Sequence, residues 1–464
     1  MTALPYDDCI ARGPVLLWGL GASGLAALRW LRAQGATVWA YDDGPQAAAG
    51  LAQAAQLGAQ LVPTWPPPAT PALAVVAPGV PPTGRLTALA AAGVPCISEA
   101  ELAATRLRGT LMAITGTNGK STTVAMLGAM VQASGRAHFV GGNLGPPLID
   151  ACAALGDDPS ALVVAELSSF QLVRCQQLRP HIAVLLNIAP DHLDWHGSFA
   201  AYAAAKGRIF QAQGRGDHAL VPADDPRALA LAQAGAAEVH VFGAGEPAWQ
   251  DGALVDRAHG LHLPLTDTAW LSPLAQHNAC VAALAARLAG LSAATIAAGL
   301  RAFQPLPHRL AHVRQLDGVD YYDDSKATNV AAAAAAVCTL GSAIAGRVLL
   351  LAGGQAKEHD FGRLRAAMQA HGGGAWLFGD SQASLHAALQ GAGPWPASKV
   401  PDLQTAVQAA QAAAQPGDAV LLAPACASFD QFASYAHRGR HFAAVVAALR
   451  AVVRPAPLPV GGGE

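Results

Sequence analysis

Charged residues, and lysine above all, are scarce in this 464-residue chain. Asp, Glu, Lys and Arg make up 13% of it, and the formal net charge is −2 with histidine counted as neutral. No basic stripe is present, which argues against nucleic acid as a partner. Only five of the 29 basic residues are lysines. A lysine in this chain is therefore a candidate for a role that arginine does not fill.

Paired cysteines and long apolar runs are also missing. The seven cysteines are odd in number and form no CxxC pair, so neither a disulfide framework nor a zinc site is indicated. The N-terminus, MTALPYDDCIARGP, has neither the basic start nor the apolar core of a signal peptide. The longest weakly polar stretch, residues 330–346, contains Thr and Ser and predicts a buried helix. We expect a soluble, cytoplasmic protein that makes no membrane association.

Short apolar runs without polar alternation recur along the chain between Ala/Leu-rich segments. Strands buried on both faces need such runs, so the pattern predicts an α/β fold with mainly parallel sheets. The runs are VLLWG, TVWAYD, LAVVAPG, LMAITG, ALVVAE, IAVLLN, RVLLLAGG, AWLFGD and AVLLAPA.

The length predicts several domains, and two breaks in the pattern suggest where they divide. One lies near residues 99–109 and the other near FQPLPHR, residues 303–309. The predicted domains are residues 1–102, 103–305 and 306–464. The tail from about residue 454, rich in Pro and Gly, is expected to be disordered.

A first glycine-rich loop, GLGASG, follows the apolar run PVLLW. Gly19, Gly21 and Gly24 would let backbone N–H groups approach a phosphate at a helix N-terminus. Asp42, at the end of the next predicted strand, is placed to bond a ribose hydroxyl. Alone, this motif is also typical of NAD-dependent oxidoreductases.

A second loop, TGTNGKSTT at residues 115–123, lies between the strand-like LMAI and a predicted helix. Its glycines, lysine and hydroxyls are the groups that cradle nucleotide phosphates and hold Mg²⁺. It is a shorter variant of the P-loop, because the first glycine of the full pattern would fall at Ile114. Two such loops suggest ATP in one domain and another phosphorylated molecule in the preceding one.

Polar residues follow two further predicted strands. Glu166 ends ALVVAE, and NIAPDHLDWH (residues 187–196) follows IAVLLN. Because Mg²⁺ prefers oxygen ligands, Glu166 and Ser121 are predicted magnesium ligands, and zinc is less favoured there. From spacing alone, DHLDWH is equally consistent with a solvated polar loop.

Eight motifs resemble the Mur ligases of bacterial cell-wall synthesis, and the resemblance runs in order from about residue 13 to 450. They are TGTNGKST, ELSSFQL, NIAPDHLDWH, AAAKGRIF, QHN (276–278), LPHR (306–309), DSKATN (324–329) and PACASFDQF (424–432). The last two are most similar to members of the family that add D-glutamate. The resemblance implies a Rossmann-like domain for a UDP-sugar, a central P-loop ATPase-type domain and a Rossmann-like C-terminal domain for the amino acid.

The implied reaction joins D-glutamate to UDP-N-acetylmuramoyl-L-alanine through an acyl phosphate. ATP and two Mg²⁺ ions are the implied cofactors, and a monomer is expected. The implied catalytic residues are Lys120, His192 and Lys206. ATP contacts are carried over to Gly116, Thr117, Asn118, Gly119, Lys120, Ser121, Thr122, Asn278, Arg309 and Asp324. The remaining sets are Ser121, Glu166, His192 and Lys206 for metal; Gly21, Ser23, Asp42 and Asn143 for the UDP-sugar; and Lys326, Thr328, Lys357, Ser428 and Tyr435 for D-glutamate.

Lys206 carries the most specific expectation. Lysine can lose its proton and act as a nucleophile, whereas arginine cannot. In the family the matching lysine reacts with CO₂ to form a carbamate, which becomes an oxygen ligand for the second magnesium. The alternative is an ordinary lysine on a helix surface that reaches solvent.

Several positions depart from the family pattern. Asp43 and Gly44 follow Asp42 where Thr and Arg are usual, so the contact made by that arginine must come from elsewhere. Ala77, Ala311 and Tyr435 replace a serine, an acidic residue and a phenylalanine.

Other functions remain open from the sequence. Another Mur ligase would add L-alanine, a diamino acid or a dipeptide, although the DNP motif of the diamino acid enzymes is missing from the C-terminal domain. Folylpolyglutamate synthetase shares the ATP loop but would not need the GLGASG domain. An NAD-dependent oxidoreductase or a nucleotide sensor would leave TGTNGKST and DSKATN without a role.

Overall fold

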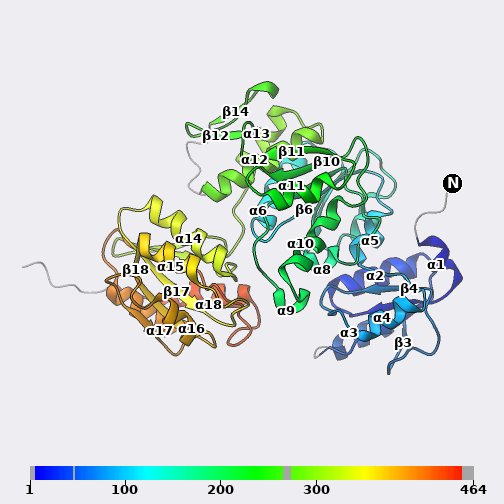
Figure 1. Ribbon diagram of the computed structural model, residues 1–464, viewed down its shortest axis with the longest axis horizontal. Coiled ribbons are helices and arrows are strands. Elements are labelled where there is room, and N and C mark those ends of the chain that lie inside the picture. The colour runs from blue at the N-terminus through cyan, green and yellow to red at the C-terminus, as the bar shows by residue number, and fades with distance from the viewer. Residues whose placement is uncertain (1–5, 45–46, 265–272, 452–464) are drawn as a thin grey trace, which may run out of the picture. The chain divides into compact units, whose positions relative to one another are not determined.

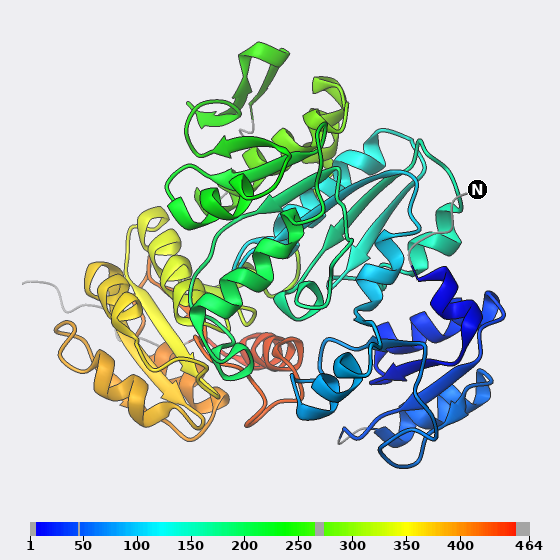
Figure 2. The ribbon, with the colours of Figure 1, turned by 45° about the vertical axis from the view of Figure 1, so that its right-hand side comes forward.

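The computed structural model describes residues 6–44, 47–264 and 273–451, and the chain forms two compact units, Met1–Gln304 and Pro305–Glu464. The first unit contains two parallel sheets and a small antiparallel one, and the second contains one mixed sheet (Figures 1 and 2). Helix α5 (Glu99–Ala104) spans the predicted boundary at residue 102. The tail predicted to be disordered lies outside the described residues.

The N-terminal sheet has the order β3-β2-β1-β4-β5, and all its strands are parallel. Its central strand β1 is buried on both faces, which explains the unbroken apolar run VLLW. The strands are β1 (Val15–Trp18), β2 (Val38–Tyr41), β3 (Gln60–Leu61), β4 (Leu73–Val76) and β5 (Cys96–Ile97), and the helices are α1 (Asp7–Arg12), α2 (Ala22–Ala33), α3 (Ala47–Gln56) and α4 (Gly84–Ala91).

The second sheet of the first unit has the order β11-β10-β9-β6-β8-β7 and is also parallel. Its strands are β6 (Thr110–Thr115), β7 (His138–Gly142), β8 (Leu162–Glu166), β9 (Ile182–Leu185), β10 (His218–Pro222) and β11 (Glu238–Phe242). A small antiparallel sheet follows, made of β12 (Ala248–Gln250), β13 (Ala253–Asp256) and β14 (Leu261–Pro264).

Helices cover both faces of this second sheet. Apolar residues of α6, α12 and α13 form one core with Met112 and Ile114 of β6. Leu111 and Ala113, which alternate with them, face a core that continues to α2 of the N-terminal sheet. The helices are α6 (Lys120–Ala133), α7 (Asp150–Leu155), α8 (Ser169–Leu172), α9 (Leu193–His196), α10 (Phe199–Gly207), α11 (Pro226–Gln233), α12 (Pro273–Leu288) and α13 (Ala293–Ala302), with 3₁₀ turns η1 (Arg208–Phe210) and η2 (Arg257–His259).

The second unit is a doubly covered sheet of order β15-β16-β20-β17-β18-β19, in which only the β15–β16 pair is antiparallel among the described strands. Its strands are β15 (Ala311–Leu316), β16 (Val319–Asp323), β17 (Val348–Gly353), β18 (Gly372–Phe378), β19 (Ala397–Lys399) and β20 (Ala419–Leu422). Helices α14 (Val330–Ala343), α15 (Gly362–His371) and α16 (Gln382–Leu389) share one apolar core, and α17 (Leu403–Ala413) and α18 (Tyr435–Ala448) share the other.

The α/β fold with mainly parallel sheets confirms the prediction. All nine apolar runs contain a strand. The stretch predicted as a buried helix forms α14, and no helix in the described part of the chain has the length and apolarity that crossing a membrane requires.

Candidate active site

The ATP loop connects β6 to α6, and the backbone conformation of the loop requires glycine at both of its glycine positions. Gly116 and Gly119 have φ values of 154° and 84°, in a region that side chains disfavour. A Cβ on Gly119 would lie 2.9 Å from Oδ1 of Asn278. Asn278 on α12, predicted to contact ATP, therefore packs directly against the loop.

Lys120 begins α6 and folds back over the loop. Its Nζ donates hydrogen bonds to the carbonyl oxygens of Gly116 at 2.7 Å and Thr117 at 3.0 Å. The N–H groups at the N-terminus of a 14-residue helix lie beside it. This combination of a lysine, glycines with positive φ values and a helix N-terminus is suited to binding phosphate.

Asn187, the first residue of NIAPDHLDWH, braces the same loop, a role that the sequence did not suggest. Its Oδ1 accepts a hydrogen bond from the backbone N–H of Asn118 at 2.9 Å, and its Nδ2 donates to the carbonyl oxygen of Asn118 at 3.1 Å. β9 and β6 are neighbours in the sheet, so the residue that follows β9 reaches the loop that follows β6.

Glu166 ends β8, which flanks β6 on its other side, and its side chain is buried. Asn143 Nδ2 donates to Oε1 of Glu166 at 2.7 Å, while Oε2 has no hydrogen-bond partner among the described residues. A buried carboxylate oxygen without a partner is costly, and a cation offsets that cost. This arrangement fits the predicted Mg²⁺ site. Asn143 thus lies beside a candidate metal ligand, and its predicted contact with the UDP-sugar remains a prediction.

The segment DHLDWH is partly packed, although Asp194 within it is exposed. Asp191 is buried, and its Oδ2 lies 3.6 Å from Nε2 of His192. The ring of His192 contacts Phe170 at a centroid distance of 4.7 Å. His196 Nε2 lies 2.9 Å from Ser169 Oγ, and burial, reinforced by the nearby Lys206, lowers the pKa of His196. These contacts hold the segment against α8.

Lys206 is almost completely buried, since only 1% of it is exposed. Its Nζ donates a hydrogen bond to the carbonyl oxygen of Gly116 at 2.8 Å and lies 4.7 Å from the ring centroid of Tyr202. Burial, and then the charge of Lys120, lower the pKa of Lys206 well below its usual range, although Asp191 and Glu166 oppose this. The interpretation of Lys206 as a solvent-reaching surface lysine is wrong.

The GLGASG turn has the close packing expected of a phosphate loop. Gly19 has φ +90°, and a Cβ on Gly24 would lie 2.0 Å from the carbonyl oxygen of Gly19. Both carboxylate oxygens of Asp42 accept backbone hydrogen bonds, from Leu20 at 2.7 Å and from Gly44 at 2.9 Å. Asp42 therefore shapes this turn. Gly21 precedes α2 and Ser23 lies in its first turn, as a phosphate-binding role would require.

An arginine lies beside this turn that the sequence did not single out. Arg85 Nη1, from α4, donates to Asp43 Oδ2 at 2.6 Å and to the hydroxyl of Tyr41 at 2.7 Å. Its guanidinium carbon lies 5.6 Å from the centroid of Trp65, which packs on Trp18 at 4.8 Å. Asp43 is one of the residues that depart from the family pattern. It holds Arg85 close to position 44, where the family usually has an arginine in the sequence.

In the second unit, the residues predicted to bind D-glutamate follow three adjacent parallel strands. Lys326 follows β16, Lys357 follows β17 and Ser428 follows β20, so all three lie at the carboxyl edge of the sheet. Lys326 Nζ lies 3.8 Å from the ring centroid of Tyr435, and Lys357 Nζ donates to Thr328 Oγ1 at 3.4 Å. The structure brings these residues to one edge.

Three of the predicted ATP contacts lie outside the loop and are divided between the units. Asn278 belongs to the first, and Arg309 and Asp324 belong to the second. Asp324 Oδ1 accepts a hydrogen bond from the backbone N–H of Leu310 at 3.2 Å. Desolvation raises the pKa of Asp324 to about 7, against the effect of Arg309.

Arg438 on α18 is fully buried and supports the loops at this edge, a role that no sequence motif indicates. Its guanidinium donates to the carbonyl oxygens of Ser325, Gly353 and Cys426 at 3.0 to 3.2 Å. Burial lowers the pKa of Arg438 to about 10. Carbonyl dipoles from the three strand ends surround this cation, so it ties those loops together.

Comparison with known proteins identifies the family. The chain is 43% identical over 454 residues to the UDP-N-acetylmuramoylalanine–D-glutamate ligase of Myxococcus xanthus, covering 94% of this chain and 98% of that one. Residues 114–284 match the Mur ligase middle domain, and residues 308–426 match the Mur ligase, glutamate ligase domain. The chain belongs to the Mur ligase family.

Other Mur ligases agree with this membership. The Frankia casuarinae protein of the same name is 44% identical over 457 residues, covering 94% of each chain. Among solved structures, MurF ligase from Thermotoga maritima in complex with ADP has a TM-score of 0.57 at 16% identity, covering 95% of this chain and 98% of that one. UDP-N-acetylmuramate-alanine ligase MurC from the same organism has a TM-score of 0.55 at 16% identity, covering 94% and 100%. These structures support the Mur ligase fold.

Proposed function

We propose that this Mur ligase uses ATP to join D-glutamate to UDP-N-acetylmuramoyl-L-alanine in peptidoglycan precursor synthesis. The relatives' names support the substrates. The observation that carries the chemistry is the convergence of the ATP loop, Glu166 and buried Lys206 at one edge of the second sheet. The protein acts as a monomer in the cytoplasm and binds neither nucleic acid nor membrane.

Phosphoryl transfer is the first step. Gly116 to Thr122 and the N-terminus of α6 hold the ATP phosphates, and Lys120 offsets the charge of the transferred group. Bound Mg²⁺ supplies further neutralisation of the phosphate charge. Ser121 and Glu166 would hold one ion, and His192 and Lys206 would hold the second. The L-alanyl carboxylate then attacks the γ-phosphorus of ATP, which displaces ADP and forms an acyl phosphate.

Lys206 becomes a metal ligand by carbamoylation. Its burial favours the neutral amine, whose lone pair attacks the carbon of CO₂. A nitrogen–carbon bond forms and a proton is lost, so a potential cation becomes an anion with two oxygens. The carbamate nitrogen keeps one N–H, which can still donate to the carbonyl oxygen of Gly116. An anionic oxygen ligand suits the hard Mg²⁺ ion, which an ammonium group would repel.

D-Glutamate binds at the carboxyl edge of the second unit's sheet. Lys326 and Lys357 match its two carboxylates, and Thr328, Ser428 and Tyr435 add hydroxyl groups. Its neutral amine attacks the acyl phosphate carbon to form a tetrahedral intermediate. Collapse of that intermediate expels inorganic phosphate and leaves the amide. Asn278, Arg309 and Asp324 bind the adenosine portion of ATP.

The UDP-sugar binds at the N-terminal sheet. Gly21, Ser23 and the GLGASG turn approach its diphosphate, Asp42 shapes the turn, and Asn143 lies near Glu166. This chain has Gly44 at the position where the family usually has an arginine, and Arg85 takes over the role of that arginine. Its guanidinium, held between Asp43 and aromatic rings, is suited to a phosphate or a uracil.

Phosphate release tests this function. The full-length protein is incubated with ATP, Mg²⁺ and UDP-N-acetylmuramoyl-L-alanine, and D-glutamate is compared with L-glutamate, L-alanine and diaminopimelate. Release should depend on D-glutamate. Release that is independent of D-glutamate, or greater with diaminopimelate, contradicts the assignment. Reduction of NAD⁺ by the protein would instead favour an oxidoreductase.

A further inference from the structure

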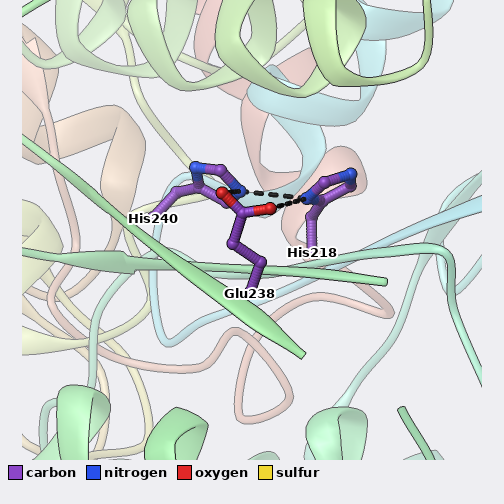
Figure 3. A group of neighbouring side chains, drawn as sticks. All are labelled: His218, Glu238 and His240. Carbon is purple, nitrogen blue, oxygen red and sulfur yellow. Dashed lines mark hydrogen bonds and ion pairs between the residues drawn. The ribbon is translucent and has the colours of Figure 1, made fainter. Parts of the chain in front are cut away.

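Two histidines and one glutamate converge on the outer strands of the second sheet, far along the sheet order from β8. His218 begins β10 and pairs in register with Glu238 at the start of edge strand β11. His240 lies two residues beyond Glu238, and side chains two apart share a face of a strand. The strand pairing therefore places all three on one face, where their polar ends meet (Figure 3).

The distances between their ligand atoms suit a metal ion. His218 Nδ1 lies 2.9 Å from His240 Nε2, and each of these nitrogens lies 3.7 Å from an oxygen of Glu238. Ligands bound at about 2.0–2.2 Å in a tetrahedral site are separated by about 3.3 Å. The observed separations bracket that value. Small side-chain rotations that move the ligand atoms by a few tenths of an ångström would therefore bring the three atoms around one ion.

We infer that His218, Glu238 and His240 form a binding site for a first-row transition-metal dication, with Zn²⁺ as its best-suited occupant. Imidazole nitrogen and carboxylate oxygen are both zinc ligands, and Mg²⁺ would prefer an all-oxygen site. Three protein ligands leave a fourth position for water. The Glu238 side chain is 67% exposed, so an ion can enter from solvent.

The surrounding charges do not prevent this. Arg287 of α12 is the cation that acts on His240. Its Nη1 contacts buried Asp256 at 3.0 Å and also His259, so its charge is largely balanced within the protein. Two neutral imidazoles and one carboxylate contribute one negative charge to the site itself.

A bound metal ion would cross-link β10 and β11 and so stabilise the edge of the sheet. β11 pairs only with β10 among the described strands, and the cluster joins the two at their first residues. Metal that binds only the folded state stabilises it by mass action. No sequence pattern indicates this site, because the two histidines are 22 positions apart and become neighbours only through parallel strand pairing.

Zinc titration of the full-length, untagged protein in excess Mg²⁺ tests the site, with bound zinc counted by mass spectrometry after gel filtration. The wild type should retain one more zinc equivalent than His240→Ala, and Glu238→Gln should weaken zinc binding about tenfold or more. His262→Ala, which removes an exposed histidine of β14, is the matched control and should bind as the wild type does. Zinc should also raise the Tm of the wild type and of His262→Ala, but not that of His240→Ala.

Cobalt binding to the wild type tests the site even if a variant unfolds. Co²⁺ bound to the wild type should give the intense visible absorption of four- or five-coordinate cobalt, and Zn²⁺ should displace it. Equal zinc retention by the wild type and a folded His240→Ala, or a cobalt spectrum of the six-coordinate aqueous type, would overturn the inference.

Discussion

Lys206 Nζ donates a hydrogen bond to the carbonyl oxygen of Gly116 at 2.8 Å, although 90 positions separate them in the chain. The contact joins the end of α10 to the start of the ATP loop. It places a completely buried amine beside the candidate phosphate site, where burial and Lys120 disfavour its protonation. A lysine so placed is better explained as a reactive amine than as a fixed cation.

Substitution of Lys206 separates these roles. Lys206→Ala should lose at least about 100-fold in kcat, the loss typical of removing one electrostatic group, and added acetate should restore part of it. Lys206→Arg should stay inactive because arginine cannot form the carbamate. Lys399→Ala changes an exposed lysine and serves as the control. Full activity of the arginine variant would mean that position 206 needs only positive charge.

Substitution of Arg85 should weaken binding of the UDP-sugar and leave binding of ATP unchanged. Arg85→Ala is expected to raise KM for UDP-N-acetylmuramoyl-L-alanine about tenfold with little change in kcat, because a binding contact distant from the reacting atoms is lost. KM for ATP should not change. Arg12→Ala, at an exposed ion pair with Asp8, is the matched control. An unchanged KM for the UDP-sugar would remove Arg85 from the proposed site.

Arg438 should position the D-glutamate loops. Arg438→Met would leave buried carbonyl oxygens of Ser325, Gly353 and Cys426 without their donor and should destabilise the second unit by about 2–5 kcal/mol. Arg438→Lys keeps the charge with fewer donors and should stay folded. Its KM for D-glutamate should rise while KM for ATP does not. Equal KM values in the folded lysine variant would limit Arg438 to a role in stability.

Glu99 should make stability depend on pH. Burial raises the pKa of Glu99 from 4.5 to about 7, although its Oε1 accepts a hydrogen bond from the backbone N–H of Ile149. The folded state therefore binds more protons than the unfolded state between those values, and stability falls as pH rises through them. The shift corresponds to a loss of about 3 kcal/mol by pH 8.

Glu99→Gln should remove this dependence, since the amide stays neutral. Urea unfolding at pH 5 and pH 8 measures the effect. Relative to Glu99→Gln, the wild type should be less stable at pH 8 than at pH 5. The same difference between wild type and variant at both values would show that the carboxyl group ionises equally well in the folded and unfolded chain.

The apolar runs of the sequence predicted nine strands and missed the other eleven strands of the described structure. VLLW and VLLLAG became strands because both faces of a central parallel strand must be apolar. The missed strands are β3, β5, β7, β10 to β16 and β19, and they include β13, which is buried throughout. Edge strands such as β7 and β11 carry polar residues such as His138 and Glu238, which interrupt an apolar run.

The candidate site was predicted to the extent that its residues follow strands or lie in motifs. Glu166 and Lys326 end up at sheet edges because βα connections place them there. Arg85, Asn187 and Arg438 were missed, since their roles depend on contacts between elements distant in the chain. Lys206 was predicted, but its complete burial could not be read from an alanine-rich helix.

The product of the reaction tests the central claim most directly. Full-length protein is incubated with ATP, Mg²⁺ and UDP-N-acetylmuramoyl-L-alanine plus either D- or L-glutamate, and the UDP-sugar is weighed by mass spectrometry. We predict that D-glutamate alone increases its mass by one glutamyl residue, with one ADP and one phosphate released for each product. A UDP-sugar of unchanged mass with D-glutamate, from protein that hydrolyses ATP or binds the UDP-sugar, would contradict the proposed function.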